Sequence, residues 1–547
     1  MANTIQTSRT SEIAMAGLRP MTLKLDFFMR RGIAELVGTC VLATLFITIA
    51  PAQVPGPTVR IEAGRLSGVP VNHGVYAYLG IPYAAPPVGQ LRWKAPQTAT
   101  PWSGVRAADH FGNKCMQRPL FSDMVFRAGG TSEDCLFLNV WTLARHAGRM
   151  PVLVYFYGGG AVAGDGSEPR YDGASFAARG IVTVTVNYRL NIFGQFAHPG
   201  LTAESPHRAS GYYGYLDQIA ALQWVARNID SFGGDPGRVT IGGESAGSFS
   251  VSTLMASPLS RGLIAGAIGE SGAVLGVSNW ISLAEAEAAG QKFATAVGHP
   301  SIAELRALSA DELLALSARP DAAWHPTLDG YVFPEAPAAI YAAGEEAHVP
   351  LLAGSNDPEL SAAEFFKGET PTLDAYRYQV QEWYGSEADA VLAQYPATDD
   401  ASARHAAEAL LSDRFIGQGT WKWVDEVARA APSSTYYYRY QKPRPATRDG
   451  KTPAGDGAVH SGEIEYALGN LAGNNVYTWT PDDEQVSQTM QGFFANFIKT
   501  GNPNGAGLPT WPPYASGQVM VIDVHSRAEH DGARDRRRFM DQLPASH

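Results

Sequence analysis

Residues 239–247, Val-Thr-Ile-Gly-Gly-Glu-Ser-Ala-Gly, decide the fold of this 547-residue chain. Residues 239–243 predict a short strand, and the small residues after Ser245 lead into a predicted helix that ends near Met255. In a tight strand-to-helix turn of the form G-x-S-x-G, the serine hydroxyl stands above the sheet, and the flanking glycines avoid a clash with neighbouring backbone. The helix also directs its free N–H groups at the serine. We therefore expect an α/β fold in which Ser245 is an exposed nucleophile.

Apolar, β-branched runs alternate with helical patterns along the rest of the chain, which indicates a large sheet flanked by helices. Residues 151–157 (PVLVYFY) and 181–188 (IVTVTVNY) are near-continuous apolar runs, as in strands buried on both faces. Further strands are predicted at residues 349–353, 435–441 and 518–524, and helices at residues 213–229, 282–318 and 487–499. We expect a mostly parallel central sheet within one domain over residues 53–547, with helical cap insertions, chiefly from residues 370–425, over the active site.

The composition is that of an ordinary globular protein, with 45% hydrophobic and 10% aromatic residues. The formal net charge is -11, and the chain has no basic tract that could neutralise phosphates. Nucleic acid is therefore not an expected partner.

The N-terminal 52 residues predict an export segment. Arg30 and Arg31 precede an apolar run at residues 36–49, and small residues at 50–52 (APA) supply a cleavage point. The run is shorter than a membrane span requires, so we expect no stable span in the mature chain, although an uncleaved membrane anchor is the alternative. The expected location is the periplasm or the medium.

Two cysteines, Cys115 and Cys135, remain after this segment is removed. An even pair in an exported protein predicts one disulfide, which would close a loop of about 20 residues and contribute about 3 kcal/mol. Two buried free thiols are the alternative, which would require a reducing compartment.

A glycine run follows the predicted strand at residues 151–157 and is placed to bind an oxyanion. Residues 158–160 are all glycine, so the backbone can approach a substrate closely and aim N–H groups at it. Together with the N–H of Ala246, those of Gly159 and Gly160 would give a three-donor oxyanion hole.

A serine nucleophile needs an acid and a histidine, which follow it in that order in folds of this kind. Of the 13 histidines, His460 is preferred because it lies in a loop of small residues after the predicted strand at 435–441. Asp357 and Glu359 both follow the strand at residues 349–353, and either carboxylate could orient the imidazole. Spacing does not choose between them.

Several long motifs together resemble the type-B carboxylesterase family, which includes bacterial esterases, cholinesterases and the non-catalytic neuroligins. The resemblance extends from about Val59 to the last predicted strand, and it is carried by residues 80–83 (GIPY), 86–89 (PPVG), 133–140 (EDCLFLNV) and 232–247. The resemblance implies an α/β-hydrolase fold and a carboxylic ester hydrolase that needs no metal or cofactor.

The resemblance also implies roles for single residues. The family pattern G-x-N-x-(D/E)-E places the acid at Glu359, and G-x-x-H-x-x-E-I places the histidine at His460. Ser271 matches a serine that supports the acid from behind, and Cys115–Cys135 matches the first disulfide of the family. Pro358 departs from the family pattern, which keeps Asp357 as a reserve for the acid.

The sequence does not determine the substrate or the oligomeric state. The whole chain also resembles bacterial esterases that release tricarballylic acid from fumonisin mycotoxins. Such a polyanionic acyl group requires cations in the pocket, and the candidates are Arg118, Arg127, Arg189, His198, His207 and Arg208. Aryl, feruloyl, amide or carbamate substrates are the alternatives.

Particular residues disfavour two other functions that occur within the family. A neuroligin-like adhesion module is disfavoured because Ser245, Glu359 and His460 are all present. A cholinesterase is disfavoured because the segment 116–134 contains no tryptophan to face a quaternary ammonium group.

Overall fold

The computed structural model describes residues 56–143, 149–319, 322 and 326–543. By its contacts the chain divides into Met1–Ala52 and Gln53–His547, and the structure describes the second unit. The predicted export segment lies outside the described residues.

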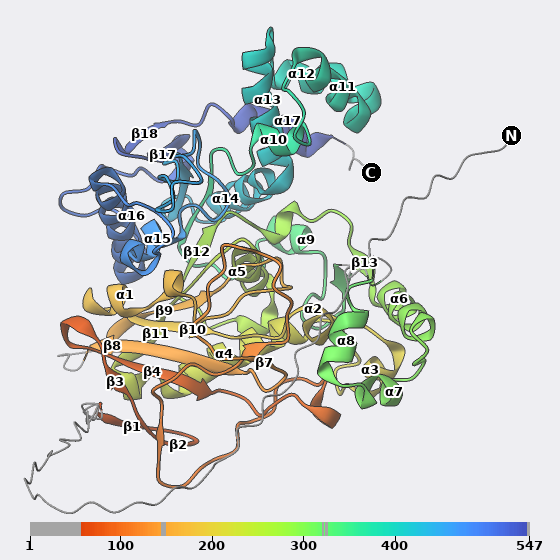
Figure 1. Ribbon diagram of the computed structural model, residues 1–547, viewed down its shortest axis with the longest axis vertical. Helices are drawn as coiled ribbons and strands as arrows, with labels where there is room; N and C mark the ends of the chain where they lie inside the picture. The colour runs from red at the N-terminus through yellow and green to blue at the C-terminus, as the bar shows by residue number, and fades with distance from the viewer. Residues whose placement is uncertain (1–55, 144–148, 320–321, 323–325, 544–547) are drawn as a thin grey trace, which may run out of the picture. The chain divides into compact units, whose positions relative to one another are not determined.

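A mostly parallel sheet runs through the described part of the chain (Figure 1). Its strands pair in parallel from β17 to β10, and antiparallel pairs extend it at both edges. In order across the sheet the strands are β18 (Arg527–His530), β17 (Gln518–Ile522), β16 (Thr435–Tyr440), β15 (Leu351–Asn356), β12 (Gly266–Glu270), β11 (Gly234–Glu244), β9 (Met150–Phe156), β10 (Val182–Val186), β8 (Phe137–Leu143), β4 (Val75–Pro82) and β3 (Val69–Pro70).

The predicted parallel strands are confirmed within a few residues of their expected bounds. All side chains of β9 and β10 are buried, as their continuous apolar character indicates. Strand β11 begins earlier than expected, at Gly234, because an irregular stretch before Val239 still pairs with β9. The sequence patterns do not indicate the antiparallel strands at the edges of the sheet. They also do not indicate the small sheets formed by β1 (Thr58–Ile61), β2 (Gly64–Ser67) and β5 (Val105–Ala107), by β6 (Lys114–Cys115) and β7 (Thr131–Ser132), and by β13 (Ile281–Ser282) and β14 (Thr327–Leu328).

Helices cover the sheet and extend from it. In chain order they are α1 (Ala174–Ala178), α2 (Asn191–Gly194), α3 (Pro199–Glu204), α4 (Tyr213–Asn228), α5 (Ala246–Ala256), α6 (Leu283–Ala296), α7 (Ile302–Ala307), α8 (Ala310–Leu316), α9 (Pro337–Ala342), α10 (Ala362–Phe365), α11 (Leu373–Tyr384), α12 (Ala388–Gln394), α13 (Asp400–Ser412), α14 (Gln418–Ala430), α15 (Ile464–Leu468), α16 (Pro481–Thr500) and α17 (Arg534–Gln542). Helix α16 begins six residues before its predicted start at 487, because Thr480 and Asp483 form a capping box around Pro481.

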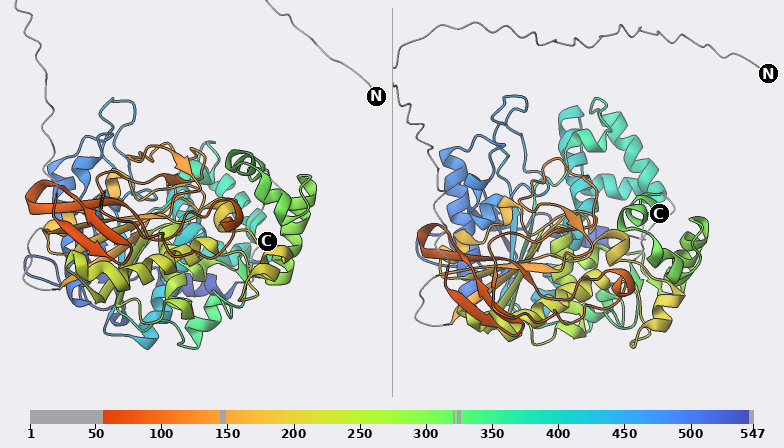
Figure 2. Two further views of the ribbon diagram at one scale, coloured as in Figure 1. Left: turned by 90° about the horizontal axis from the view of Figure 1, so that it is seen from below. Right: turned by 60° about the horizontal axis from the view of Figure 1, so that its bottom comes forward.

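Two helical clusters lie beside the main core. One combines α10–α13 with the end of α17, and the other combines α6, α7 and α8 with part of the segment 190–216. Figure 1 shows the first cluster above α14 and the second near α3, and Figure 2 shows the same helices, in teal and green, from two further sides. Within the described residues, no helix combines the length and the apolar character that a membrane span requires.

Candidate active site

Ser245 occupies the sharp turn between β11 and α5. Its backbone has φ 53° and ψ -121°, a conformation that is strained for a residue with a side chain. A Cβ at Gly243 would lie 2.6 Å from the carbonyl carbon of Gly247, and one at Gly247 would lie 2.0 Å from the carbonyl oxygen of Phe156. The turn therefore requires glycine at both positions, and it presents the serine at the carboxyl end of a central strand.

His460 meets this serine from a distant loop between β16 and α15. Its Nε2 lies 2.9 Å from Oγ of Ser245. The backbone N–H of His460 donates to the carbonyl oxygen of Glu359, at 2.8 Å, so the histidine loop and the acid loop are joined through their main chains as well. The histidine predicted from its small-residue loop is the one that the fold brings to Ser245.

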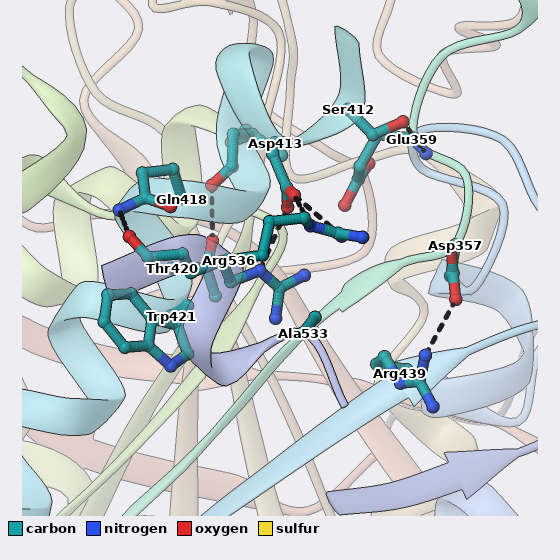
Figure 3. Close-up of polar contacts among 12 residues, drawn as sticks. Asp357, Glu359, Ser412, Asp413, Gln418, Thr420, Trp421, Arg439, Ala533 and Arg536 are labelled. Carbon is teal, nitrogen blue, oxygen red and sulfur yellow. Dashed lines mark hydrogen bonds and ion pairs between the residues drawn. The ribbon is translucent and has the colours of Figure 1, made fainter. Parts of the chain in front are cut away.

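Glu359 lies on the other side of the imidazole. Its Oε2 is 2.8 Å from Nδ1 of His460, and its Oε1 accepts a hydrogen bond from the backbone N–H of Asn356 at 2.7 Å. Asp357 instead accepts hydrogen bonds from Arg439 (3.3 Å) and Gln441 (2.9 Å), and Figure 3 shows its side chain directed at Arg439. Of the two candidate acids, the geometry places Glu359 against the histidine.

Three further carboxyl groups lie buried around this site. Burial raises the pKa of Glu244 to about 8 and that of Glu463 to about 7, and it raises the pKa of Glu270 well above its ordinary value. These groups therefore hold protons near neutral pH more readily than exposed carboxyls do.

The surrounding carboxyl groups act on His460 in turn. Burial of the imidazole opposes its protonation, but Glu244 and Glu359 outweigh burial and raise the pKa of His460 above its ordinary value. The site thus favours the imidazolium form, which a histidine adopts once it has taken a proton from a nucleophile.

The predicted oxyanion-binding glycines follow β9. Gly159 and Gly160 have φ values of 108° and 64°, in the region that favours glycine. A Cβ at Gly159 would lie 2.3 Å from the carbonyl oxygen of Ala163. Both glycines line the same cavity as Ser245, and so does Ala246, whose N–H belongs to the unpaired first turn of α5. The structure therefore brings the three residues that carry the expected donors to the cavity that Ser245 lines.

Ser271 supports the acid less directly than the sequence predicts. Its hydroxyl donates to Oε1 of Glu463 at 3.4 Å. Glu463 accepts a second hydrogen bond from the side chain of Asn356 at 2.5 Å, and the backbone N–H of Asn356 holds Glu359. The hydrogen-bonded route from Ser271 to Glu359 therefore runs through Glu463 and Asn356.

A cavity of about 510 Å³ opens in front of Ser245 and His460. Segments that are distant in the sequence form its walls, including the loop closed by the Cys115–Cys135 disulfide, which is present as predicted. Many of the lining side chains are apolar or aromatic, among them Phe121, Met124, Tyr188, Tyr215, Phe249, Phe415 and Ile416. The predicted cap contributes through the last two, which lie between α13 and α14.

Two arginines line this cavity, and both are paired. Arg189, one of the six predicted candidates, donates to Asp217 through Nε (2.8 Å) and Nη2 (2.7 Å). Arg170 was not among the candidates, since no sequence pattern distinguishes it. It forms ion pairs with Glu168 (2.8 Å) and Asp123 (3.1 Å).

The other five predicted cations do not line the cavity that the described residues form: Arg118, Arg127, His198, His207 and Arg208. Arg127 pairs with Asp172, Nδ1 of His198 caps α3, and His207 stacks on Tyr331. Of the six candidates, Arg189 alone lines the cavity that the described residues form, and Asp217 already balances its charge.

The amino-acid sequence is similar to those of known esterases. The model of the carboxylesterase family matches residues 55–540. A fumonisin B1 esterase of Sphingopyxis macrogoltabida is 34% identical, with 92% of this chain and 93% of that protein covered. A para-nitrobenzyl esterase of Bacillus subtilis (strain 168) is 33% identical (88% and 97% covered), and a liver carboxylesterase of Sus scrofa is 34% identical (86% and 90% covered).

These matches span nearly the whole described chain, including the turn at Ser245 and the loops of Glu359 and His460. The mostly parallel sheet with flanking helices is the α/β-hydrolase fold of that family. The chain therefore belongs to the carboxylesterase family and is a carboxylic ester hydrolase.

Proposed function

We propose that the enzyme works through an acyl-enzyme on Ser245, with His460 as general base and acid and Glu359 as the orienting acid. The observation that supports this most is the unbroken series of contacts from Oγ of Ser245 to Nε2 of His460 (2.9 Å) and from Nδ1 of His460 to Glu359 (2.8 Å), with Ser245 and His460 lining the cavity. In serine hydrolases of several folds, this arrangement removes the proton from the serine and stabilises the imidazolium that results.

The reaction then follows from these groups. His460 takes the proton of Ser245 as Oγ bonds to the carbonyl carbon, and the N–H groups of Gly159, Gly160 and Ala246 stabilise the negative oxygen. His460 returns the proton to the alcohol as the ester C–O bond breaks. Water, deprotonated by the same histidine, attacks the acyl-enzyme and releases the acid and the free serine.

We further propose that the protein is exported and that residues 53–547 act as one catalytic domain. The Cys115–Cys135 disulfide supports export, because such bonds persist in oxidising compartments. The apolar run at residues 36–49 supports it independently.

For the substrate, the cavity supports an uncharged ester with apolar groups on both sides of the bond. Its lining is largely apolar, and Arg170 and Arg189 are neutralised by their own carboxylates. Phe121 and Phe415 line the cavity while about 44% and 45% exposed, which extends its apolar surface to the mouth. Burying such surface stabilises a bound apolar group by about 25 cal/mol per Å².

Tricarballylate esters of the fumonisin type are the second candidate. The 34% identical fumonisin B1 esterase supports them. Binding this polyanion would require Arg170 or Arg189 to exchange a protein carboxylate for one on the substrate, which costs the existing pair.

Two measurements test these proposals. An organophosphonate should label Ser245 and abolish turnover, and Ser245→Ala should lose both the label and the activity. Turnover should then be compared among a neutral aryl ester, a feruloyl ester, a tricarballylate ester and an amide matched to the aryl ester. A higher kcat/KM for the tricarballylate ester would favour the second candidate, and equal turnover of amide and ester would argue against a dedicated esterase.

A further inference from the structure

The predicted cap contains an interruption in regular helix that lies behind the acid of the proposed triad. Helices α13 and α14 are continuous except for a π-helical turn, Asp413–Gly417, in which the N–H of Gln418 donates to the carbonyl oxygen of Asp413. The hydroxyl of Thr420 donates to the carbonyl oxygen of Ile416, at 3.0 Å, which steadies the turn from α14. Turns of this kind occur frequently at functional sites.

Ser412, the last residue of α13, contacts the acid loop directly. Its Oγ accepts hydrogen bonds from the backbone N–H groups of Glu359 (3.0 Å) and Leu360 (3.3 Å). Figure 3 shows Ser412 beside Glu359, with the dashed line between them. Ser412 and Glu359 are buried, so their contact is shielded from competing water.

The neighbouring residue anchors this turn to the C-terminal helix. Nε of Arg536 and Nε of Arg537, both on α17, each donate to the carboxylate of Asp413 at 3.0 Å. The hydroxyl of Tyr395 donates to the same carboxylate at 3.0 Å. Burial opposes ionisation of Asp413, but the two guanidinium groups prevail and lower its pKa. The position of Ser412 is therefore set by a fixed charged cluster.

 The hydrogen bonds of Glu359 come from different parts of the chain. Its backbone carbonyl oxygen and its Oε2 contact His460, the residue that must itself be oriented, and its Oε1 contacts Asn356, which ends β15 three residues earlier. Ser412 holds the acid from a separate element, 53 residues away in the chain. It therefore fixes the main chain of Glu359 relative to the body of the fold.

We propose that Ser412 is a positioning residue for the catalytic acid: its hydroxyl, held in place by the π-helical turn and Asp413, orients Glu359 towards His460. The proposal rests on the proposed triad. Phe415, in the same turn, packs edge-on against His460 with ring centroids 5.0 Å apart, so this turn contacts both partners of Ser245.

A purely structural role is the competing explanation, because any buried N–H group needs an acceptor. Ser412→Thr and Ser412→Val separate the two roles, since the side chains have nearly the same shape and only threonine keeps the oxygen. We expect Ser412→Thr to retain activity, and Ser412→Val to lose about 10- to 100-fold in kcat with KM unchanged, as expected for a misplaced catalytic group.

Thr435→Val is the matched control, because it removes a buried hydroxyl that donates to the carbonyl oxygen of Ala431 (2.9 Å) at the end of β16 opposite to the acid loop. It should lower the melting temperature and leave kcat unchanged.

A double-mutant cycle then tests whether Ser412 acts through the acid. In a Glu359→Gln background, Ser412→Val should change kcat by less than about twofold, because the group that it positions is already disabled. An equal fold-loss in both backgrounds, or equal kcat values for the Thr and Val variants, would overturn the inference. Full activity of Glu359→Gln alone would instead overturn the proposed triad, so the two failures are distinguishable.

Discussion

Oε1 of Glu244 lies 3.4 Å from Nε2 of His460. This is the same nitrogen that contacts Oγ of Ser245 at 2.9 Å. A buried carboxyl group therefore adjoins the atom through which the proton of the nucleophile must pass, and it raises the pKa of His460. The residue at the second position of the G-x-S-x-G turn thus has an electrostatic role in addition to its place in the backbone.

Glu244→Gln should shift the pH dependence of the enzyme. Removing this carboxyl lowers the pKa of His460, and the general base must be neutral to act, so the acidic limb of kcat/KM should move to lower pH. The measurement is kcat/KM for a neutral aryl ester from about pH 5 to about pH 9. Glu345→Gln, at an exposed position, serves as the control, and an acidic limb that stays in place or rises would contradict the prediction.

Glu359→Gln should reduce kcat by about 10⁴-fold, because the amide cannot stabilise the imidazolium and favours the wrong tautomer. Asp357→Asn should retain nearly full kcat, since Asp357 contacts Arg439 and Gln441 rather than His460. Burst kinetics with an aryl ester would measure both acylation rates. The reverse pattern, with Asp357→Asn inactive, would assign the acid to Asp357.

Replacing Cys115 and Cys135 together by alanine should lower the free energy of unfolding by about 3 kcal/mol, because the disulfide closes a loop of about 20 residues. The same loop carries Phe121 and Met124 into the cavity, so KM should rise more than kcat falls. Thermal melting and steady-state kinetics, with and without reductant, would show both effects. A melting temperature that does not respond to reductant or to the substitution would contradict this expectation.

Asp217→Ala should be among the most damaging single changes outside the triad. It leaves the guanidinium of Arg189 buried without its carboxylate, which costs about 3–5 kcal/mol. The exposed pair between Glu62 and Arg227 is the matched control, since Glu62→Ala should cost about 1 kcal/mol or less. Urea unfolding of both variants would test the difference. Similar losses would mean that burial of the Arg189–Asp217 pair carries no special weight.

The sequence by itself determined the local features of this enzyme. Continuous apolar runs predicted the buried parallel strands, because such strands have no solvent-facing side. The glycines around Ser245 predicted its turn, because backbone contacts there leave no room for a Cβ. The small-residue loop around His460 indicated the catalytic histidine. Only the family resemblance favoured Glu359 over Asp357 as the acid, since both carboxylates follow the same strand.

Only the tertiary structure decided which distant groups serve the site. Ser412 meets Glu359 across 53 residues of sequence, and Arg170 meets Asp123 across 47. No local pattern encodes such contacts, because serines and arginines are ordinary surface residues and acquire a role only when folding brings a partner within hydrogen-bonding distance. Whether an arginine offers a free charge to a substrate likewise depends on which carboxylates the fold buries beside it, and that is a property of the packed protein rather than of any segment of it.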